Sequence, residues 1–205
     1  MIKPLHITAF LLCLCCSCNL AGLGLQEDYD FKPSIPDPAV KMTAWEFINQ
    51  PRADTLFVKM LAGIRYAGLE EEYSKPGRTF ILLTNKAIYE KSAAGVELAT
   101  SYFVKNKVNG KPATRWEDYP VQQVRNLFLY HIMEGEYSYH NINTDTTVVN
   151  TLLPGTNVKF RILDYNDSKL TFNDFPGTKK GVQARTSNIR PLNGVIHVVD
   201  LYLEY

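Results

Sequence analysis

NGVIHVVDLYLEY, residues 193–205, is the stretch that decides how this chain folds. The dipeptide Asn193-Gly194 favours a tight turn with two positive φ angles, and the β-branched run from Val195 to Val199 predicts a buried strand. Side chains alternate along a strand, so His197 shares a face with Val195 and Val199. Because an imidazole among apolar side chains needs a hydrogen-bond partner, we expect His197 to be a structural residue.

Two further segments precede this stretch: RTFILLTNKAIYE at residues 78–90 and LYHIMEGEY at residues 129–137. Three such segments in this order are typical of one family, and over residues 43–205 the chain resembles the fasciclin-like domain family. The resemblance implies an α+β fold in which a helical layer covers a wedge of two small β-sheets. One departure is Ile88, where the family usually has an aromatic residue, and this change affects core volume rather than the fold.

The order of the predicted elements gives the same fold class. Thr43 and Glu46 form a capping box, and Asp54 can cap a second helix that has an apolar stripe and ends near Gly68. Thr84 or Asn85 can cap a short helix through Glu90, and a further helix runs from Pro120 to near Gly135. Helices mostly precede strands, which is an α+β order. The predicted strands are residues 79–83, 102–107, 148–152, 158–163, 169–172, 182–184 and 195–199, and a turn at residues 109–110 is predicted to close a hairpin.

Residues 1–18 have the pattern of a lipoprotein signal peptide. Lys3 is their only charge, an apolar run covers residues 7–16, and the small residue Ser17 precedes Cys18. We therefore expect export, lipidation of Cys18 and anchoring to a bacterial envelope, at the outer membrane. Cys16 is the alternative lipidation residue.

The positions of all the cysteines support this interpretation. All four lie at or before Cys18, so the mature chain has no internal disulfide. A metal-binding cysteine cluster is the rival hypothesis, and the apolar, leucine-rich surroundings argue against it.

Residues 19–42 are interpreted as a tether, because they contain Gly, Pro and acidic residues without sustained periodicity. The fasciclin-like domain is then residues 43–205. The chain has 22 basic and 21 acidic residues, and loss of Lys3 with the leader makes the mature chain neutral. This balance gives no attraction to nucleic acid.

Four residues of the upstream segments have a structural and a binding interpretation. Thr84 and Asn85 follow a predicted strand and are assigned first to satisfying helix-terminal amides. Tyr130 and His131 match the family's tyrosine-histidine pair, which in animal members has been linked to integrin binding. His131 falls on the apolar stripe of its helix, which favours a buried structural role, and Tyr130 lies beside that stripe.

Tyr137 and Tyr139 are the better candidates for an exposed binding surface, because tyrosine supplies contact area for sugars or proteins at low entropic cost. Metal and cofactor sites are not expected. The three histidines after the leader, His131, His140 and His197, lack ligand spacing. Catalytic motifs are absent from the sequence, so we expect a protein that is not an enzyme.

Two functions fit these observations. The first is a lipid-anchored adhesion or binding module that recognises an extracellular protein or polysaccharide and touches the membrane only through its lipid. The alternative is an accessory glycan-binding subunit of a surface polysaccharide-uptake complex, with an outer-membrane transport partner. A hydrolase would need paired carboxylates in a cleft, and Glu134 and Glu136 merely flank the predicted end of a helix at Gly135.

Overall fold

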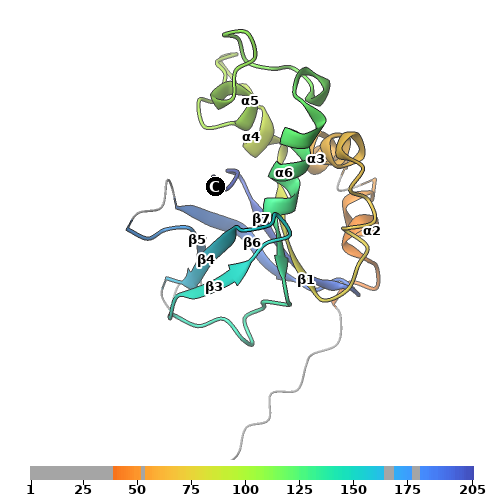
Figure 1. The fold of residues 1–205 in the computed structure, drawn as a ribbon, viewed down its shortest axis with the longest axis vertical. Coiled ribbons are helices and arrows are strands. Elements are labelled where there is room, and N and C mark those ends of the chain that lie inside the picture. Colours follow the sequence, from red (N-terminus) through yellow and green to blue (C-terminus); the bar gives the residue numbers. More distant parts are fainter. Residues whose placement is uncertain (1–38, 52–53, 164–168, 177–180) are drawn as a thin grey trace, which may run out of the picture. The chain divides into compact units, whose positions relative to one another are not determined.

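Two buried strands, β1 (Arg78–Leu83) and β7 (Gly194–Val199), pair in parallel (Figure 1). The computed structural model describes residues 39–51, 54–163, 169–176 and 181–205. In their register Ile81 lies opposite His197. Every residue of β7 is buried, as are all residues of β1 except Arg78. Strands covered on both faces are mostly apolar, which explains the apolar run FILL in β1 and the valines and isoleucine around His197 in β7.

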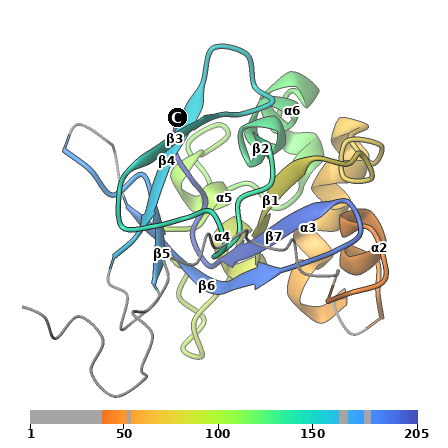
Figure 2. The same cartoon turned by 90° about the horizontal axis from the view of Figure 1, so that it is seen from below.

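The other strands extend from this pair in the order β2-β1-β7-β6-β5-β4-β3, and all their pairings are antiparallel (Figure 2). Strand β6 pairs with β5 near its start and with β7 along the rest, with register shifts between Ala184 and Ile189. Such irregularities bend a sheet. The predicted α+β class is confirmed, and the two small sheets share β6. Their strands are β2 (Ile132–Glu134), β3 (Thr147–Asn150), β4 (Asn157–Ile162), β5 (Leu170–Phe172) and β6 (Val182–Ile189).

The two edge strands of this order come together where the chain just past β3 pairs with β2. Met133 forms an antiparallel bridge with Thr151, and the amide of Leu152 donates to the carbonyl of Ile132 at 2.9 Å. The curved sheet therefore comes back onto itself at this point.

A helical layer packs against β1 and β2. Helix α3 contacts β1, and α6 contacts both α3 and β2. Gly63 of α3 allows this packing, since a Cβ there would lie 2.5 Å from the Phe128 ring and 2.7 Å from the Trp116 ring. The helices are α2 (Ala44–Ile48), α3 (Asp54–Ala67), α4 (Asn85–Ile88), α5 (Tyr102–Lys105), the 3-10 turn η1 (Trp116–Asp118) and α6 (Val121–Tyr130).

The predicted capping box is confirmed: Thr43 Oγ1 accepts from the amide of Glu46, and Glu46 accepts from the amide of Thr43. The predicted apolar stripe of α3 is also buried at Phe57, Met60 and Ile64. Gly68 follows the helix with a φ of +61°, as expected for a helix stop.

The strand predicted at residues 102–107 is wrong. Residues 102–105 form one helical turn, α5, in which Tyr102 and Phe103 are both buried. An alternating strand would have put these two neighbouring rings on opposite faces, whereas both pack against Trp116. The turn at Asn109-Gly110 is confirmed, although only the bridge between Val108 and Lys111 flanks it.

Helix α6 ends at Tyr130, five residues before the predicted stop at Gly135. Residues 132–134 instead form β2, which pairs with β1. The ring of His131 ends the helix, because its Nδ1–H donates to the carbonyl of Leu127 at 2.8 Å. In a continuing helix that carbonyl would accept the amide of residue 131.

The boundary of the domain also moves. The amide of Val40 donates to the carbonyl of Arg190 at 3.0 Å, and the carbonyl of Met42 accepts the amide of Leu192 at 2.8 Å. Residues 40–42, assigned above to the tether, thus belong to the fold. The predicted lipidation residue Cys18, its alternative Cys16 and most of the tether lie outside the described residues. Within the described ranges, no helix combines the length and apolarity that a membrane span requires.

Candidate functional site

The fully buried side chain of His131 links α6 to the segment that follows β7. Its Nδ1–H donates to the Leu127 carbonyl, and its Nε2 accepts the amide of Leu203 at 2.9 Å. These two bonds fix one neutral tautomer, and burial lowers the pKa of the ring to about 4. Both ring nitrogens are used by the backbone, so the geometry gives His131 a structural role.

His197 has the same arrangement on β7. Its Nδ1 accepts the amide of Asn188 at 3.2 Å, and its Nε2–H donates to the carbonyl of Tyr137 at 2.9 Å. The ring is fully buried, which lowers its pKa to about 4. The imidazole thus connects β7 to the irregular part of β6 and to the loop after β2.

Tyr130 is also buried and hydrogen-bonded within the fold. Its side chain is 2% exposed, and its hydroxyl donates to the Asn157 carbonyl at 3.2 Å and accepts from Asn173 Nδ2 at 2.9 Å. The tyrosine-histidine pair is therefore buried as a unit. A ligand-binding role for Tyr130 or His131 remains a prediction that would require the surface to open.

Thr84 and Asn85 bond to other elements rather than capping α4. Thr84 Oγ1 donates to Asp200 Oδ1 at 2.8 Å. The Asn85 carboxamide accepts the amide of Lys59 and donates to the carbonyl of Thr55, both at 2.9 Å. The carboxamide therefore lies between the Thr55 carbonyl and the Lys59 amide, which would bond to each other in a regular helix. Satisfying a helix amide was expected of Asn85, but that amide belongs to α3.

Asn193 and Gly194 connect β7 to its surroundings, and the expected pair of positive φ angles is wrong. Gly194 has a φ of +153°, and Asn193 is not in that region. The Asn193 carboxamide, 4% exposed, accepts the amide of Ala44 at 2.7 Å and donates to the carbonyls of Tyr73 and Lys75. A Cβ on Gly194 would lie 1.9 Å from the carbonyl oxygen of Arg78, so glycine is required by the close approach of β1.

Tyr137 and Tyr139 differ in exposure. Tyr137 is half-buried, with its ring 5.2 Å from that of Phe160 and against Gly135. Tyr139 is 38% exposed. Only Tyr139 keeps the surface position expected of a binding residue, so the two do not form one exposed patch.

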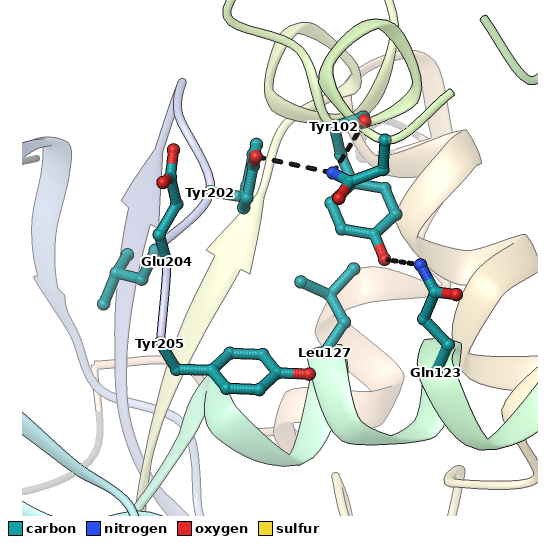
Figure 3. A pocket seen from close by; sticks show the side chains of 8 residues that line it. Tyr102, Gln123, Leu127, Tyr202, Glu204 and Tyr205 are labelled. Carbon is teal, nitrogen blue, oxygen red and sulfur yellow. Dashed lines mark hydrogen bonds between the residues drawn. The ribbon is translucent and has the colours of Figure 1, made fainter. Parts of the chain in front are cut away.

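A solvent-open cavity of about 180 Å³ lies between α5, α6 and residues 202–205 (Figure 3). Figure 3 shows Tyr102 and Leu127 on one side of it, facing Tyr202 and Tyr205 on the other. The lining residues are Tyr102, Asn106, Gln123, Leu127, Tyr202, Leu203, Glu204 and Tyr205. Aromatic rings together with a few polar groups are the usual lining of a small-molecule site.

Hydrogen bonds hold the lining in place. Gln123 Nε2 donates to the hydroxyl of Tyr102 at 3.0 Å, and Asn106 Nδ2 donates to the hydroxyl of Tyr202 at 3.4 Å. The rings of Tyr102 and Tyr202 meet edge to face at 5.1 Å. Burial raises the pKa of Tyr102 to about 12 and also raises that of Tyr202, so both hydroxyls stay protonated at neutral pH.

One ion pair lies at the rim of the cavity. Lys105 donates to the carboxylate of Glu204, and its ammonium lies 5.8 Å from the centre of the Tyr202 ring. The hydrogen bond to Glu204 raises the pKa of Lys105. Lys105 at the rim therefore balances the charge of Glu204, and the other polar groups of the lining are hydroxyls and carboxamides.

Sequence reasoning missed this cavity. Tyr102 lies in the segment predicted as a strand, and the prediction for residues 193–205 rests on their valines and histidine. The repeated tyrosines of DLYLEY, Tyr202 and Tyr205, were the available signal. In the described part of the chain, no group of three His, Cys, Asp or Glu side chains could hold a metal ion.

Comparisons with known proteins agree with this geometry. Among solved structures, the chain is similar to a FAS1 domain pair from the insect cell adhesion molecule fasciclin I, with a TM-score of 0.54 and 11% identity. The match covers 81% of this chain and 52% of that one, so the chain spans about half the length of the pair, and it shows the fold alone. A comparison with curated proteins gave no match. The model of the fasciclin domain matches residues 57–204, most of the chain, and the protein therefore belongs to the fasciclin domain family.

Proposed function

We propose that this protein is a non-catalytic binding and adhesion module of a bacterial envelope, presenting one fasciclin domain to an extracellular protein or polysaccharide. The observation that carries the proposal is the family match over residues 57–204, because fasciclin domains are commonly adhesion or binding modules. The cavity beside α6 supports it, since it offers a surface site without using the buried histidines.

Anchoring is the first part of the proposal. The pattern of residues 1–18 supports lipidation of Cys18, and the acyl chains would supply the affinity for the outer membrane. We expect Cys18→Ala to move the protein out of the membrane fraction, with Cys16→Ala as the matched control that stays there. Metabolic labelling with a fatty acid measures the lipid directly. If Cys16→Ala lost the label and Cys18→Ala kept it, Cys16 would be the lipidated residue.

Adhesion is the second part. Cells that display the full chain should adhere more strongly to surfaces coated with matrix proteins or envelope polysaccharides than cells that express Cys18→Ala. Equal adhesion by the two strains to every coated surface would contradict the proposal.

The alternative function is a subunit of a polysaccharide-uptake complex. The tyrosine and carboxamide lining of the cavity favours it, because these groups suit sugars. Capture from intact envelopes with the full chain as bait separates the two functions: an outer-membrane transporter would support the alternative, and a matrix protein would support adhesion.

A further inference from the structure

We propose that the cavity between α5, α6 and residues 202–205 binds a single neutral sugar unit of a polysaccharide. This inference deepens the proposed function and rests on it, because it names the ligand class of the binding module. It places recognition on the side chains of Tyr102, Gln123, Tyr202 and Tyr205 rather than on the tyrosine-histidine pair.

The size of the cavity sets the size of the ligand. Pockets for drug-sized molecules have about 300–1,000 Å³. The volume here, about 180 Å³, is smaller and suits a single ring with its substituents. Because the cavity is open to solvent, the rest of a longer chain can continue outside it.

The hydrogen-bonding groups match hydroxyls. The hydroxyl of Tyr102 accepts from Gln123 and still carries its own proton to donate, while Gln123 Oε1 remains an acceptor. The Tyr202 hydroxyl likewise accepts from a carboxamide, Asn106 Nδ2, and keeps its own proton to donate. A sugar hydroxyl both donates and accepts, so it can pair with each of these groups.

Charge selects a neutral ligand. The only ionised side chain in the lining is Glu204, and because Lys105 already pairs with it, the lining offers no unpaired cation to an anionic sugar. The protonated tyrosine hydroxyls add no charge.

Preorganisation differs across the lining. Tyr102 is 5% exposed and Tyr202 is 9% exposed, and both are held by carboxamides and neighbouring rings. Tyr205 is 51% exposed and packs on Tyr130 with ring centres 4.9 Å apart. Its ring therefore offers the contact area for the apolar face of a sugar.

The test measures retention of the detergent-purified full chain on bead-coupled dextran, β-1,3-glucan, mannan, galactan, xylan and arabinan, with polygalacturonate and hyaluronate as anionic polymers. We expect binding to at least one neutral polymer and to neither anionic one. Tyr205→Ala and Gln123→Ala should each weaken that binding about tenfold, the loss of one good contact. The matched controls, Tyr139→Ala and Gln122→Ala, alter another exposed tyrosine and the neighbouring exposed glutamine and should bind as wild type.

A second measurement uses the unaltered protein, so it does not depend on the variants folding. Nitration of Tyr205 by tetranitromethane, followed by peptide mass mapping, should fall when the bound polymer is added, while nitration of Tyr139 should not change. The cavity proposal is overturned if no neutral polymer binds, if a polyanion binds better, or if Tyr205 is not protected. Adhesion that persists under those outcomes leaves the proposed function standing, whereas loss of all adhesion removes both.

Discussion

At the scale of single residues, two neutral imidazoles hold segments that are distant in sequence. His131 joins the end of α6 to Leu203, and His197 joins β7 to Asn188 and Tyr137. Each ring donates once and accepts once, a pairing that a doubly protonated ring cannot make.

Acid should therefore weaken the fold. The pKa of each ring is about 4 in the folded protein and about 6.5 in the unfolded chain, so between these values the unfolded chain binds more protons. The free energy of unfolding should fall as pH drops from about 6.5 to about 4, by up to roughly 3 kcal/mol per ring. Urea unfolding at several pH values measures this slope, and His131→Gln or His197→Gln should flatten it. A slope unchanged in both variants would contradict the assignment.

Removing either ring should also destabilise the protein at neutral pH. His131→Ala leaves the amide of Leu203 without its acceptor, and His197→Ala does the same to Asn188. Each loss should lower the free energy of unfolding by about 1–3 kcal/mol for the hydrogen bond alone. Thermal and urea unfolding give the values, and His140→Ala, at an exposed position, is the control. A variant that melts like wild type yet fails to bind would assign that histidine to the ligand instead.

At the scale of elements, the parallel contact between β1 and β7 depends on Gly194. We expect Gly194→Ala to cost several kcal/mol or to prevent folding, because the new Cβ would lie 1.9 Å from a backbone oxygen. Gly95→Ala is the matched control: its φ is +77° and its Cβ would meet open space, so only the backbone strain of about 1–3 kcal/mol applies. Chemical unfolding compares the two variants, and equal losses would show that the close approach to Arg78 is relaxed at little cost.

At the scale of the whole molecule, residues 203–205 close the structure. Leu203 is fully buried and its amide donates to His131, so Leu203 belongs to the core. Deleting residues 203–205 should lower the melting temperature by well over 5 °C, since one buried leucine alone contributes about 2–5 kcal/mol. Deleting Tyr205 alone, which is half-exposed, should have a much smaller effect. Equal melting of the two truncated chains would show that Leu203 contributes little.

The sequence predicts this fold where a signal is local or repeated. A residue spacing predicts three of its features: the capping box at Thr43, the apolar stripe of α3 and the apolar run of β7. The buried position of His197 followed from the same alternation.

The wrong predictions concern features that depend on contacts between residues distant in the sequence. The helical turn at Tyr102 is set by the rings it packs against, the end of α6 by a side chain that binds Leu203, and the conformation of Asn193 by three backbone partners. The cavity combines residues about 100 positions apart, such as Tyr102 and Tyr202. No window along the chain contains both.

The bridge between Met133 and Thr151 has a consequence for the protein at high local concentration. Open strand edges are templates on which neighbouring copies polymerise, and this hazard grows with local concentration. Here β2 and β3, the two ends of the strand order, come together, so part of each edge is already occupied within the same molecule. Many copies can then lie close together without these edges pairing with one another into fibres.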